Sequence, residues 1–284
     1  MKIKLVLFKP DIPRFRILDS YLEVIASLEW GFTQLGHECS SCLNAVDTSC
    51  VNIVFGWIPA LLNGNVFPPG TILYNLEQFS TQTMRGQRVL EVAAQHYQIW
   101  DYSAANIQRW MELAPRFPVF LAPISYAPSL KRVAATASED IDILYIGSLG
   151  PKRAEKIISV GSTQRQSSVV TLSNVWGRQR DTFISRAKLL LNVSNENPLQ
   201  TIFEIVRVSY YLANRKAVIC EQLPTMSSED DMRSTLLFVT PDQLASTCDE
   251  YLEDVDKRRT YAQAGFEIFR QRDVRIVLQS FFGS

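Results

Sequence analysis

The sequence is poor in the residues that mark several common classes of protein. It contains two histidines and five cysteines in 284 residues, and its formal net charge is zero. An odd cysteine count argues against a complete disulfide framework, and two histidines argue against a structural zinc site. A balanced charge gives no general attraction to nucleic acid or to an anionic membrane surface. We therefore expect any anionic ligand to be held by local groups of arginine, lysine and helix ends.

Long apolar runs are also missing. No stretch approaches the roughly 18 consecutive apolar residues that a membrane-spanning helix needs. At the N-terminus the only apolar run, residues 5–8, stops at Lys9 and Pro10, so the apolar core and cleavage site of a secretory signal are not there. These absences favour a cytoplasmic protein without a transmembrane segment.

Two of the cysteines, Cys39 and Cys42, have the CxxC spacing of a redox pair or of half a zinc site. No second CxxC motif follows, and the surrounding pattern lacks the strand and helix of a thioredoxin-like motif. We interpret these cysteines as buried or incidental thiols, and we expect no metal ion and no cofactor.

Short apolar runs alternate with segments of helical periodicity, which is typical of βαβ units around parallel sheets. In the first half we expect helices at 20–35 and 104–112, and strands at residues 3–8, 51–55, 71–74, 98–100 and 119–122. In the second half we expect strands at residues 141–146, 169–172, 189–193, 217–220 and 236–239. The helices of that half are expected from residue 151 and at 178–187, 202–213, 241–256 and 258–269.

Residues 123–140 lose this periodicity and carry prolines, small residues and mixed charge, which is typical of a connection between domains. We therefore expect an α/β fold of two consecutive domains joined by this connection. The first domain would cover residues 1–125 and the second residues 126–284. The last helix is a candidate to cross back to the first domain.

The first candidate site follows the expected strand at 141–146. Gly147 and Ser148 come directly after this strand, and Lys152 and Arg153 lie in the first turn of the next helix. A glycine at a strand end lets a ligand approach the backbone, and a helix N-terminus presents unpaired N–H groups to an anion. The alternative is an ordinary turn whose basic residues point to solvent.

The second candidate site lies where the strand at 189–193 opens into the polar loop 195–201 and then a helix. Glu204 and Arg207 are three residues apart and share a helical face. Ligands of open parallel sheets bind at the carboxyl ends of the strands, where this loop lies. A surface ion pair is the alternative, but Phe203 and its apolar neighbours indicate a largely buried helix and favour a functional pair.

Further polar or aromatic groups also follow expected strands. Trp176 and Gly177 lie between a strand and a helix, where an indole could frame a nucleobase or simply pack in the core. In the first half, Glu77 and Asp101 follow two strands, and such carboxylates can act as a general base or orient an acceptor hydroxyl.

Several of these segments together resemble bacterial GT-B glycosyltransferases of the family 1/4-like type. In the second half the resemblance is carried by residues 142–149 with the following Lys152 and Arg153, and by 180–192, 202–207 and 212–221. In the first half it is carried by residues 74–78, 100–106 and 123–128. The individual motifs are loose, but their order and spacing are fairly specific.

This resemblance implies two Rossmann-like domains that face a cleft. It implies that the second domain binds a nucleotide-diphosphate sugar and the first domain an acceptor, without a metal ion. It implies that Lys152 or Arg153 holds phosphate and that Glu204 contacts donor hydroxyls. The donor-binding candidates are then Gly147, Ser148, Lys152, Arg153, Trp176, Gly177, Phe203, Glu204 and Arg207, and the catalytic candidates Glu77, Asp101 and Glu204. Many retaining members carry a second glutamate where this chain has Leu212, so retention and inversion both stay open.

A glycosyltransferase is thus the leading hypothesis, with a glycan, a lipid-linked molecule, a protein or a small molecule as acceptor. Nucleic acid is a disfavoured acceptor, because the neutral chain has no obvious basic stripe. A nucleotide-sugar epimerase of the same fold is one alternative, but it needs more acid–base residues than the sequence offers. The other is a protein that binds the nucleotide or nucleotide sugar without turnover. The sequence leaves the oligomeric state open.

Overall fold

The chain forms two compact units, and we describe each by itself. Unit 1 comprises Met1–Ser129 and Asp273–Ser284, and unit 2 comprises Leu130–Arg272. The computed structural model describes residues 1–78, 84–113, 116–134, 136, 138–162, 165–194, 202–222, 232 and 236–283, with the side chains of 13–15 and 84–87 left out. The loop 195–201 of the second candidate site lies outside the described residues.

Unit 1 is built on a six-stranded parallel sheet with the strand order β2-β1-β3-β4-β5-β6. Its strands are β1 (Lys2–Leu7), β2 (Glu38–Leu43), β3 (Val51–Phe55), β4 (Ile72–Asn75), β5 (Gln98–Asp101) and β6 (Val119–Leu121). Its helices are η1 (Pro13–Tyr21), α1 (Leu22–Gln34), α2 (Trp57–Leu62), α3 (Met84–His96), α4 (Ala104–Leu113) and α11 (Val274–Phe282), and the short η2 (Pro128–Leu130) follows β6.

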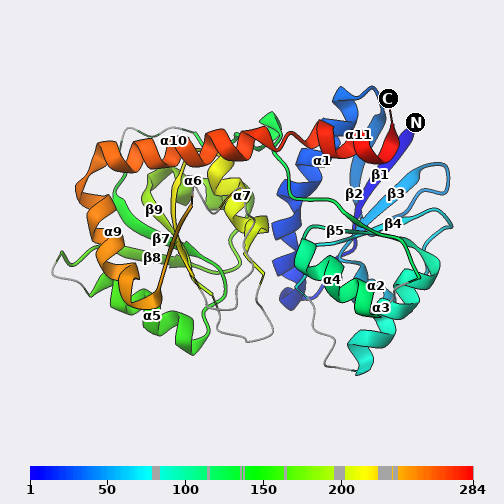
Figure 1. Ribbon diagram of the computed structural model, residues 1–284, viewed down its shortest axis with the longest axis horizontal. Coiled ribbons are helices and arrows are strands. Elements are labelled where there is room, and N and C mark those ends of the chain that lie inside the picture. Colours follow the sequence, from blue (N-terminus) through cyan, green and yellow to red (C-terminus); the bar gives the residue numbers. More distant parts are fainter. Residues whose placement is uncertain are drawn as a thin grey trace. The chain divides into compact units, whose positions relative to one another are not determined.

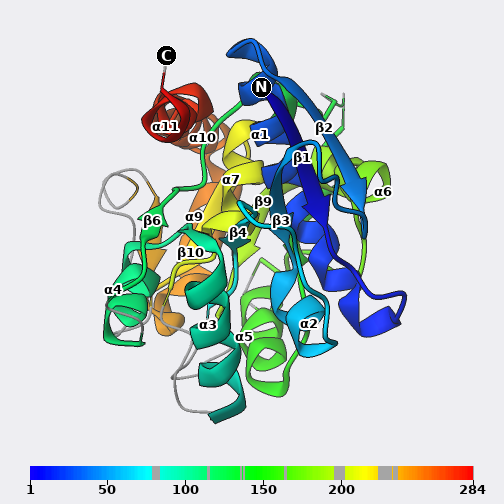
Figure 2. The ribbon, with the colours of Figure 1, turned by 90° about the vertical axis from the view of Figure 1, so that its right-hand side faces the viewer.

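Helices cover both faces of this sheet (Figure 2). One face packs on α2, α3 and α4 through a core that includes Trp57, Leu90 and Trp110. On the other face the last helix, α11, packs against α1. A Cβ atom on Gly31 would lie 2.8 Å from Leu278 and from Val274, so glycine permits this close contact. The chain therefore ends within unit 1.

Unit 2 is built on a five-stranded parallel sheet with the strand order β11-β10-β9-β7-β8 (Figure 1). Its strands are β7 (Ile141–Ile146), β8 (Val169–Leu172), β9 (Ala187–Asn192), β10 (Ala217–Glu221) and β11 (Leu237–Val239). Its helices are α5 (Pro151–Gly161), α6 (Gly177–Arg186), α7 (Ile205–Ala213), η3 (Pro241–Gln243), α9 (Leu244–Glu253) and α10 (Val255–Gln271). The central strands are buried on both faces, which explains their nearly continuous apolar sequence.

The predicted α/β class with two Rossmann-like sheets is confirmed, and strands β3, β7 and β8 have the predicted bounds. Strand β2 and helices α2, α3 and α11 were not expected. Cys39 and Cys42 lie on β2, where residues three apart point to opposite faces and cannot chelate one ion together. All five cysteines are free thiols, and Cys220 and Cys248 are buried. None of the helices in the described ranges is both long enough and apolar enough to cross a bilayer.

Candidate functional site

The strand order of unit 2 defines where a ligand would bind. β7 and β9 are neighbours in the sheet, while β8 continues it on one side and β10 on the other. The connections leave these two central strands in opposite directions, which makes their carboxyl ends a topological switch point. Gly147 and Ser148 follow β7 there, and Asn192 ends β9. This edge contains most of the predicted donor-binding residues.

Arg207 joins the two strand ends at the switch point. Its Nη1 donates to the backbone oxygen of Ile146 at 3.0 Å, and its Nη2 donates to Oδ1 of Asn192 at 2.6 Å. Burial lowers the pKa of Arg207, but the nearby charges of Glu204 and Tyr145 more than offset this, so its pKa lies above the ordinary value. A fixed guanidinium cation therefore stands at the carboxyl ends of β7 and β9.

The structure explains why residue 147 is a glycine, which the sequence did not show. A Cβ atom at this position would lie 2.7 Å from Nη1 of Arg207 and 2.5 Å from the hydroxyl oxygen of Tyr145. The absence of a side chain therefore lets the guanidinium and the tyrosine approach the end of β7. Glycine at 147 shapes the site through these two neighbours.

Arg153 has a structural role within the site. It is buried, its Nε donates to the backbone oxygen of Val193 at 3.0 Å, and its Nη1 donates to the backbone oxygen of Ser148 at 2.7 Å. It therefore ties the turn after β7 to the end of β9. Lys152, the other predicted phosphate ligand, is exposed in the first turn of α5. Of the two cations, Lys152 is the one whose side chain is accessible.

Glu204 is placed beside Arg207, as the spacing predicted. It is the residue before α7, its Oε2 lies 3.9 Å from Nη2 of Arg207, and 39% of its side chain is exposed. Phe203 behaves differently from the prediction, because its side chain is 1% exposed and packs edge-on against Phe238 with 5.1 Å between ring centroids. Phe203 is therefore a core residue, whereas the carboxylate of Glu204 is accessible.

A buried carboxylate at the end of β10 was not predicted as part of the site. Glu221 is 1% exposed, accepts a hydrogen bond from Nζ of Lys156, and accepts another from the backbone N–H of Ser194 at 2.9 Å. It therefore fixes the chain just after β9. The signal in the sequence was a carboxylate directly after the apolar run of the expected strand at 217–220.

Trp176 and Gly177 lie at the start of α6, after the edge strand β8. Gly177 has a positive φ of 59°, a conformation that favours glycine. The indole N–H of Trp176 is buried and finds no hydrogen-bond partner among the described residues. Among the described residues of unit 2, no hydrogen bond connects this pair to Arg207. The structure thus places them at a separate point of the same sheet edge.

In unit 1, Asp101 has the surroundings of a structural carboxylate. It is fully buried, and its oxygens accept four hydrogen bonds, from Ser103 N (3.0 Å), Asn106 Nδ2 (3.1 Å), Asn75 Nδ2 (2.7 Å) and Trp110 Nε1 (2.9 Å). A carboxylate has about four such acceptor positions. These bonds join the ends of β4 and β5 to α4, so Asp101 organises the strand ends from below the surface.

Glu77 is more accessible. Its side chain is exposed, and its Oε1 accepts a hydrogen bond from the hydroxyl of Tyr21. Its backbone oxygen accepts from the side-chain amides of Asn75 and Asn106, both at 2.9 Å. The same two amides bind Asp101, so the structure connects the two predicted carboxylates of unit 1. Glu77 is the one that can reach a ligand.

The pKa of Asp101 makes a testable prediction. Burial raises it to about 6 from the ordinary 3.8, although the four hydrogen bonds lower it. The folded chain thus holds this proton up to about pH 6, whereas the unfolded chain releases it near pH 4. The resulting stabilisation is full below the unfolded pKa and is lost as the pH rises through the folded one.

Asp101→Asn cannot titrate and serves as the reference. Between pH 7 and pH 4, the unfolding free energy of the wild type should rise relative to this variant by about 2 kcal/mol. Urea unfolding at pH 7 and at pH 4 measures this difference in unfolding free energy. Hydrogen exchange of β4 and β5 measures it locally, in the strands beside Asp101. A difference that does not change with pH would contradict a raised pKa.

Among the residues that the structure describes, no group of three or more His, Cys, Asp and Glu side chains is arranged to hold a metal ion. The cations that the site itself supplies are Arg207, Arg153 and Lys152.

Solved structures share this fold over nearly the whole chain. HepE of Anabaena, solved with UDP and glucose, has a TM-score of 0.65 and 12% identity, and the match covers 98% of this chain and 97% of HepE. A variant of BGT from T4 phage, solved with UDP-glucose, has a TM-score of 0.62 and 11% identity over 100% of both chains. AviGT4, a glycosyltransferase involved in avilamycin A biosynthesis, has a TM-score of 0.55 and 16% identity over 100% of this chain and 99% of its own.

These likenesses define the fold as that of the GT-B class, as the resemblance implied. No protein-family model matches the sequence, and no curated protein matches it. At identities of 11–16% the likeness concerns the fold. The argument for function therefore depends on the residues of the site.

Proposed function

We propose that the protein is a glycosyltransferase that moves a sugar from a nucleotide-diphosphate donor to an acceptor. The observation that carries this proposal is the pair of Arg207 and Glu204 at the switch point of unit 2. A cation fixed at two strand ends suits a diphosphate, and an accessible carboxylate beside it suits sugar hydroxyls. HepE and BGT were solved with UDP or UDP-glucose, which makes a UDP-sugar the first donor to test.

In this proposal the chemistry of the donor site is electrostatic. Transfer breaks the bond between the anomeric carbon and the β-phosphate oxygen, and negative charge grows on the departing nucleoside diphosphate. Arg207 is already held by Ile146 and Asn192, so it stabilises that charge without reorganising. Lys152, exposed in the first turn of α5, adds a second cation. We propose that these side chains perform the charge stabilisation without a metal ion or another cofactor.

Glu204 would hold the donor sugar, and Glu77 would serve the acceptor. Glu204 precedes α7 and can accept hydrogen bonds from sugar hydroxyls. Glu77, oriented by Tyr21, can accept the proton of an acceptor hydroxyl or orient that hydroxyl. Asp101 would act as a positioning residue that shares Asn75 and Asn106 with Glu77. The stereochemical course stays open, because Leu212 replaces the second glutamate of many retaining enzymes.

The free cysteines bear on the cellular compartment of the protein. Five free cysteines suit a reducing compartment, so we propose that the enzyme works in the cytoplasm, and the resemblance in sequence is to bacterial proteins. Its acceptor is unidentified.

A panel of nucleotides tests the proposal. We expect UDP, or another of GDP, ADP, CMP and TDP, to raise the thermal midpoint of the chain, because a ligand that binds only the folded state stabilises it. The sugar conjugate of the stabilising nucleotide should then be hydrolysed slowly in the absence of an acceptor. Stabilisation without hydrolysis would favour a binding protein over an enzyme, and a panel without any stabilising nucleotide would exclude the proposed donor site.

A further inference from the structure

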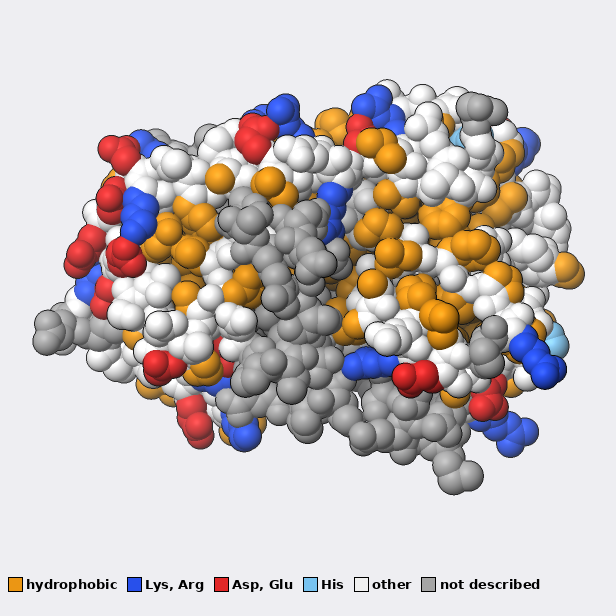
Figure 3. Space-filling view, in the orientation of Figure 1, with side chains coloured by type: hydrophobic (Ala, Val, Ile, Leu, Met, Phe, Trp, Pro, Cys, Tyr) orange, Lys and Arg blue, Asp and Glu red, His pale blue; other side chains and the backbone are white. Residues whose placement is uncertain are grey.

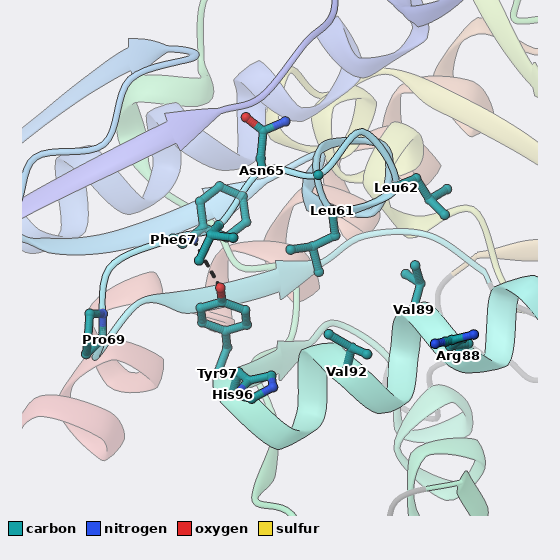
Figure 4. Close-up of a pocket in the computed structure, with 12 residues that line it drawn as sticks. Leu61, Leu62, Asn65, Phe67, Pro69, Arg88, Val89, Val92, His96 and Tyr97 are labelled. Atoms are coloured by element: carbon teal, nitrogen blue, oxygen red, sulfur yellow. Dashed lines mark hydrogen bonds between the residues drawn. The ribbon is translucent and has the colours of Figure 1, made fainter.

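A cavity lies in unit 1, away from the strand ends that contain Glu77 and Asp101. Figure 3 shows that hydrophobic side chains gather on one face of unit 1. Between α2 and α3, such side chains enclose a pocket of about 690 Å³ (Figure 4). Its apolar lining includes Leu61, Leu62, Val66, Phe67, Val89 and Val92.

The position of this pocket separates it from the proposed reaction. Residues 63–71 lead from α2 into the amino end of β4, and Tyr97 directly precedes β5. Glu77 and Asp101, in contrast, follow or end these strands at the carboxyl edge. The pocket therefore lies on the helical layer and toward the opposite edge of the sheet, so a ligand there would not occupy the strand-end site.

The walls of the pocket are unusually exposed for apolar side chains. Val66 is 82% exposed, Val92 40% and Leu62 39%. Single exposed apolar residues are common, but a concave group of them with a few polar side chains is the usual form of a small-molecule site. The volume is also that of such sites, which run from about 300 to 1,000 Å³.

The polar groups of the pocket indicate the charge of its ligand. Asn65 already donates to the backbone oxygen of Ala60 at 2.9 Å, and the hydroxyl of Tyr97 accepts from the backbone N–H of Phe67 at 3.0 Å. Arg88 is exposed on α3, and its side chain makes no hydrogen bond or ion pair with any residue that the structure describes. The lining includes Arg88 and His96 and no aspartate or glutamate.

We propose that this pocket binds a small amphipathic anion. Its apolar body would lie along Leu61, Val89 and Val92, which project into the cavity in Figure 4, and its anionic group would pair with Arg88 at one end. A charge-assisted pair beside an apolar wall gives both affinity and orientation. A nucleotide sugar does not fit this lining, because its many hydroxyls would meet apolar side chains. The inference does not depend on the proposed transferase activity.

Two fluorescent probes test this site on the full-length chain. Anilinonaphthalene sulfonate carries an apolar body and one negative charge, and N-phenylnaphthylamine has a similar body without the charge. We expect saturable binding of both. Arg88→Gln should weaken the sulfonate about tenfold and the neutral probe less than about twofold. Arg116→Gln, at another exposed arginine of unit 1, is the matched control and should change neither.

Two further variants locate the probe in the cavity. Val92→Trp fills it from an exposed helical position and should abolish saturable binding of both probes. Val66→Asp, at the most exposed wall residue, places a negative charge near the site and should weaken the sulfonate about tenfold. Far-ultraviolet circular dichroism confirms that each variant is folded.

Some results would overturn the proposal. Equal sulfonate affinity in the wild type and in Arg88→Gln would show that Arg88 does not pair with the anionic group. Unchanged binding in folded Val92→Trp would show that the probes bind elsewhere. Displacement of the sulfonate by saturating UDP would assign it to the donor site. Binding of the probes without any response to UDP would support this pocket and, separately, contradict the proposed function.

Discussion

Replacing Glu204 by alanine is expected to reduce sugar transfer by at least about 100-fold. In the proposed mechanism the Glu204 carboxylate accepts hydrogen bonds from the donor sugar, and alanine leaves those hydroxyls without a partner. Hydrogen bonds to a charged group contribute about 1.5–3 kcal/mol each, so two of them account for a loss of this size. The effect should fall mainly on turnover, because the diphosphate is held by other residues.

The fold should survive this change. The Glu204 side chain is 39% exposed, makes no capping hydrogen bond to α7, and stands 3.9 Å from Arg207. Such a partly exposed pair contributes at most about 1 kcal/mol. Circular dichroism and the thermal midpoint of Glu204→Ala should therefore remain close to those of the wild type.

The measurement is donor hydrolysis and sugar transfer by wild type and variant at equal concentrations. Glu253→Ala is the matched control, because Glu253 also stands 3.9 Å from an arginine, Arg165, but is 70% exposed and lies on α9. It should keep full activity. If Glu204→Ala kept the turnover of the wild type, Glu204 would have no catalytic role and would only pair with Arg207 at the surface.

Arg207→Met is expected to have the second large effect, on the site and on the sheet around it. Loss of the guanidinium leaves the backbone oxygen of Ile146 and the buried Oδ1 of Asn192 without their donors. Each unsatisfied buried acceptor costs about 1–3 kcal/mol, so we expect unit 2 to lose about 3 kcal/mol of stability. UDP affinity should fall by at least about tenfold, because the fixed cation is gone.

Hydrogen exchange of peptides from β7 and β9 measures the local loss of stability, and calorimetry measures the loss of UDP binding. Arg259→Met, at an exposed position of α10 in the same unit, is the control and should change neither. If Arg207→Met matched this control in both measurements, Arg207 would not be the centre of the site.

The central strands, which are buried on both faces, could be predicted from their apolar sequence. Residues 141–146 and 189–193 form apolar runs because helices cover both sides of the parallel sheet, and such runs stand out in any sequence. Strand β2, with the sequence ECSSCL, could not be recognised, because it is an edge strand with mostly exposed side chains. The pairing with β1 that makes it a strand is a tertiary contact.

The site could be predicted only as far as chain order places residues at strand ends. Gly147, Glu204 and Arg207 follow from that logic. The four donors around Asp101 and the contact of Glu77 with Tyr21 depend on side chains that fold together from distant segments. The burial of Phe203 against Phe238 is of the same kind. Sequence spacing does not encode these directions, which decide whether a residue faces a ligand or the core.

Calorimetric titration of the full-length chain with UDP and with uridine tests the donor site most directly. The two ligands share the base and the ribose and differ in the diphosphate, which is the group that Arg207 and Lys152 are proposed to hold. The account predicts saturable binding of UDP and at least about tenfold weaker binding of uridine, with this difference reduced in Arg207→Met, where Lys152 remains. Equal affinities for the two ligands, or no binding of UDP together with none of the other nucleoside diphosphates, would contradict it.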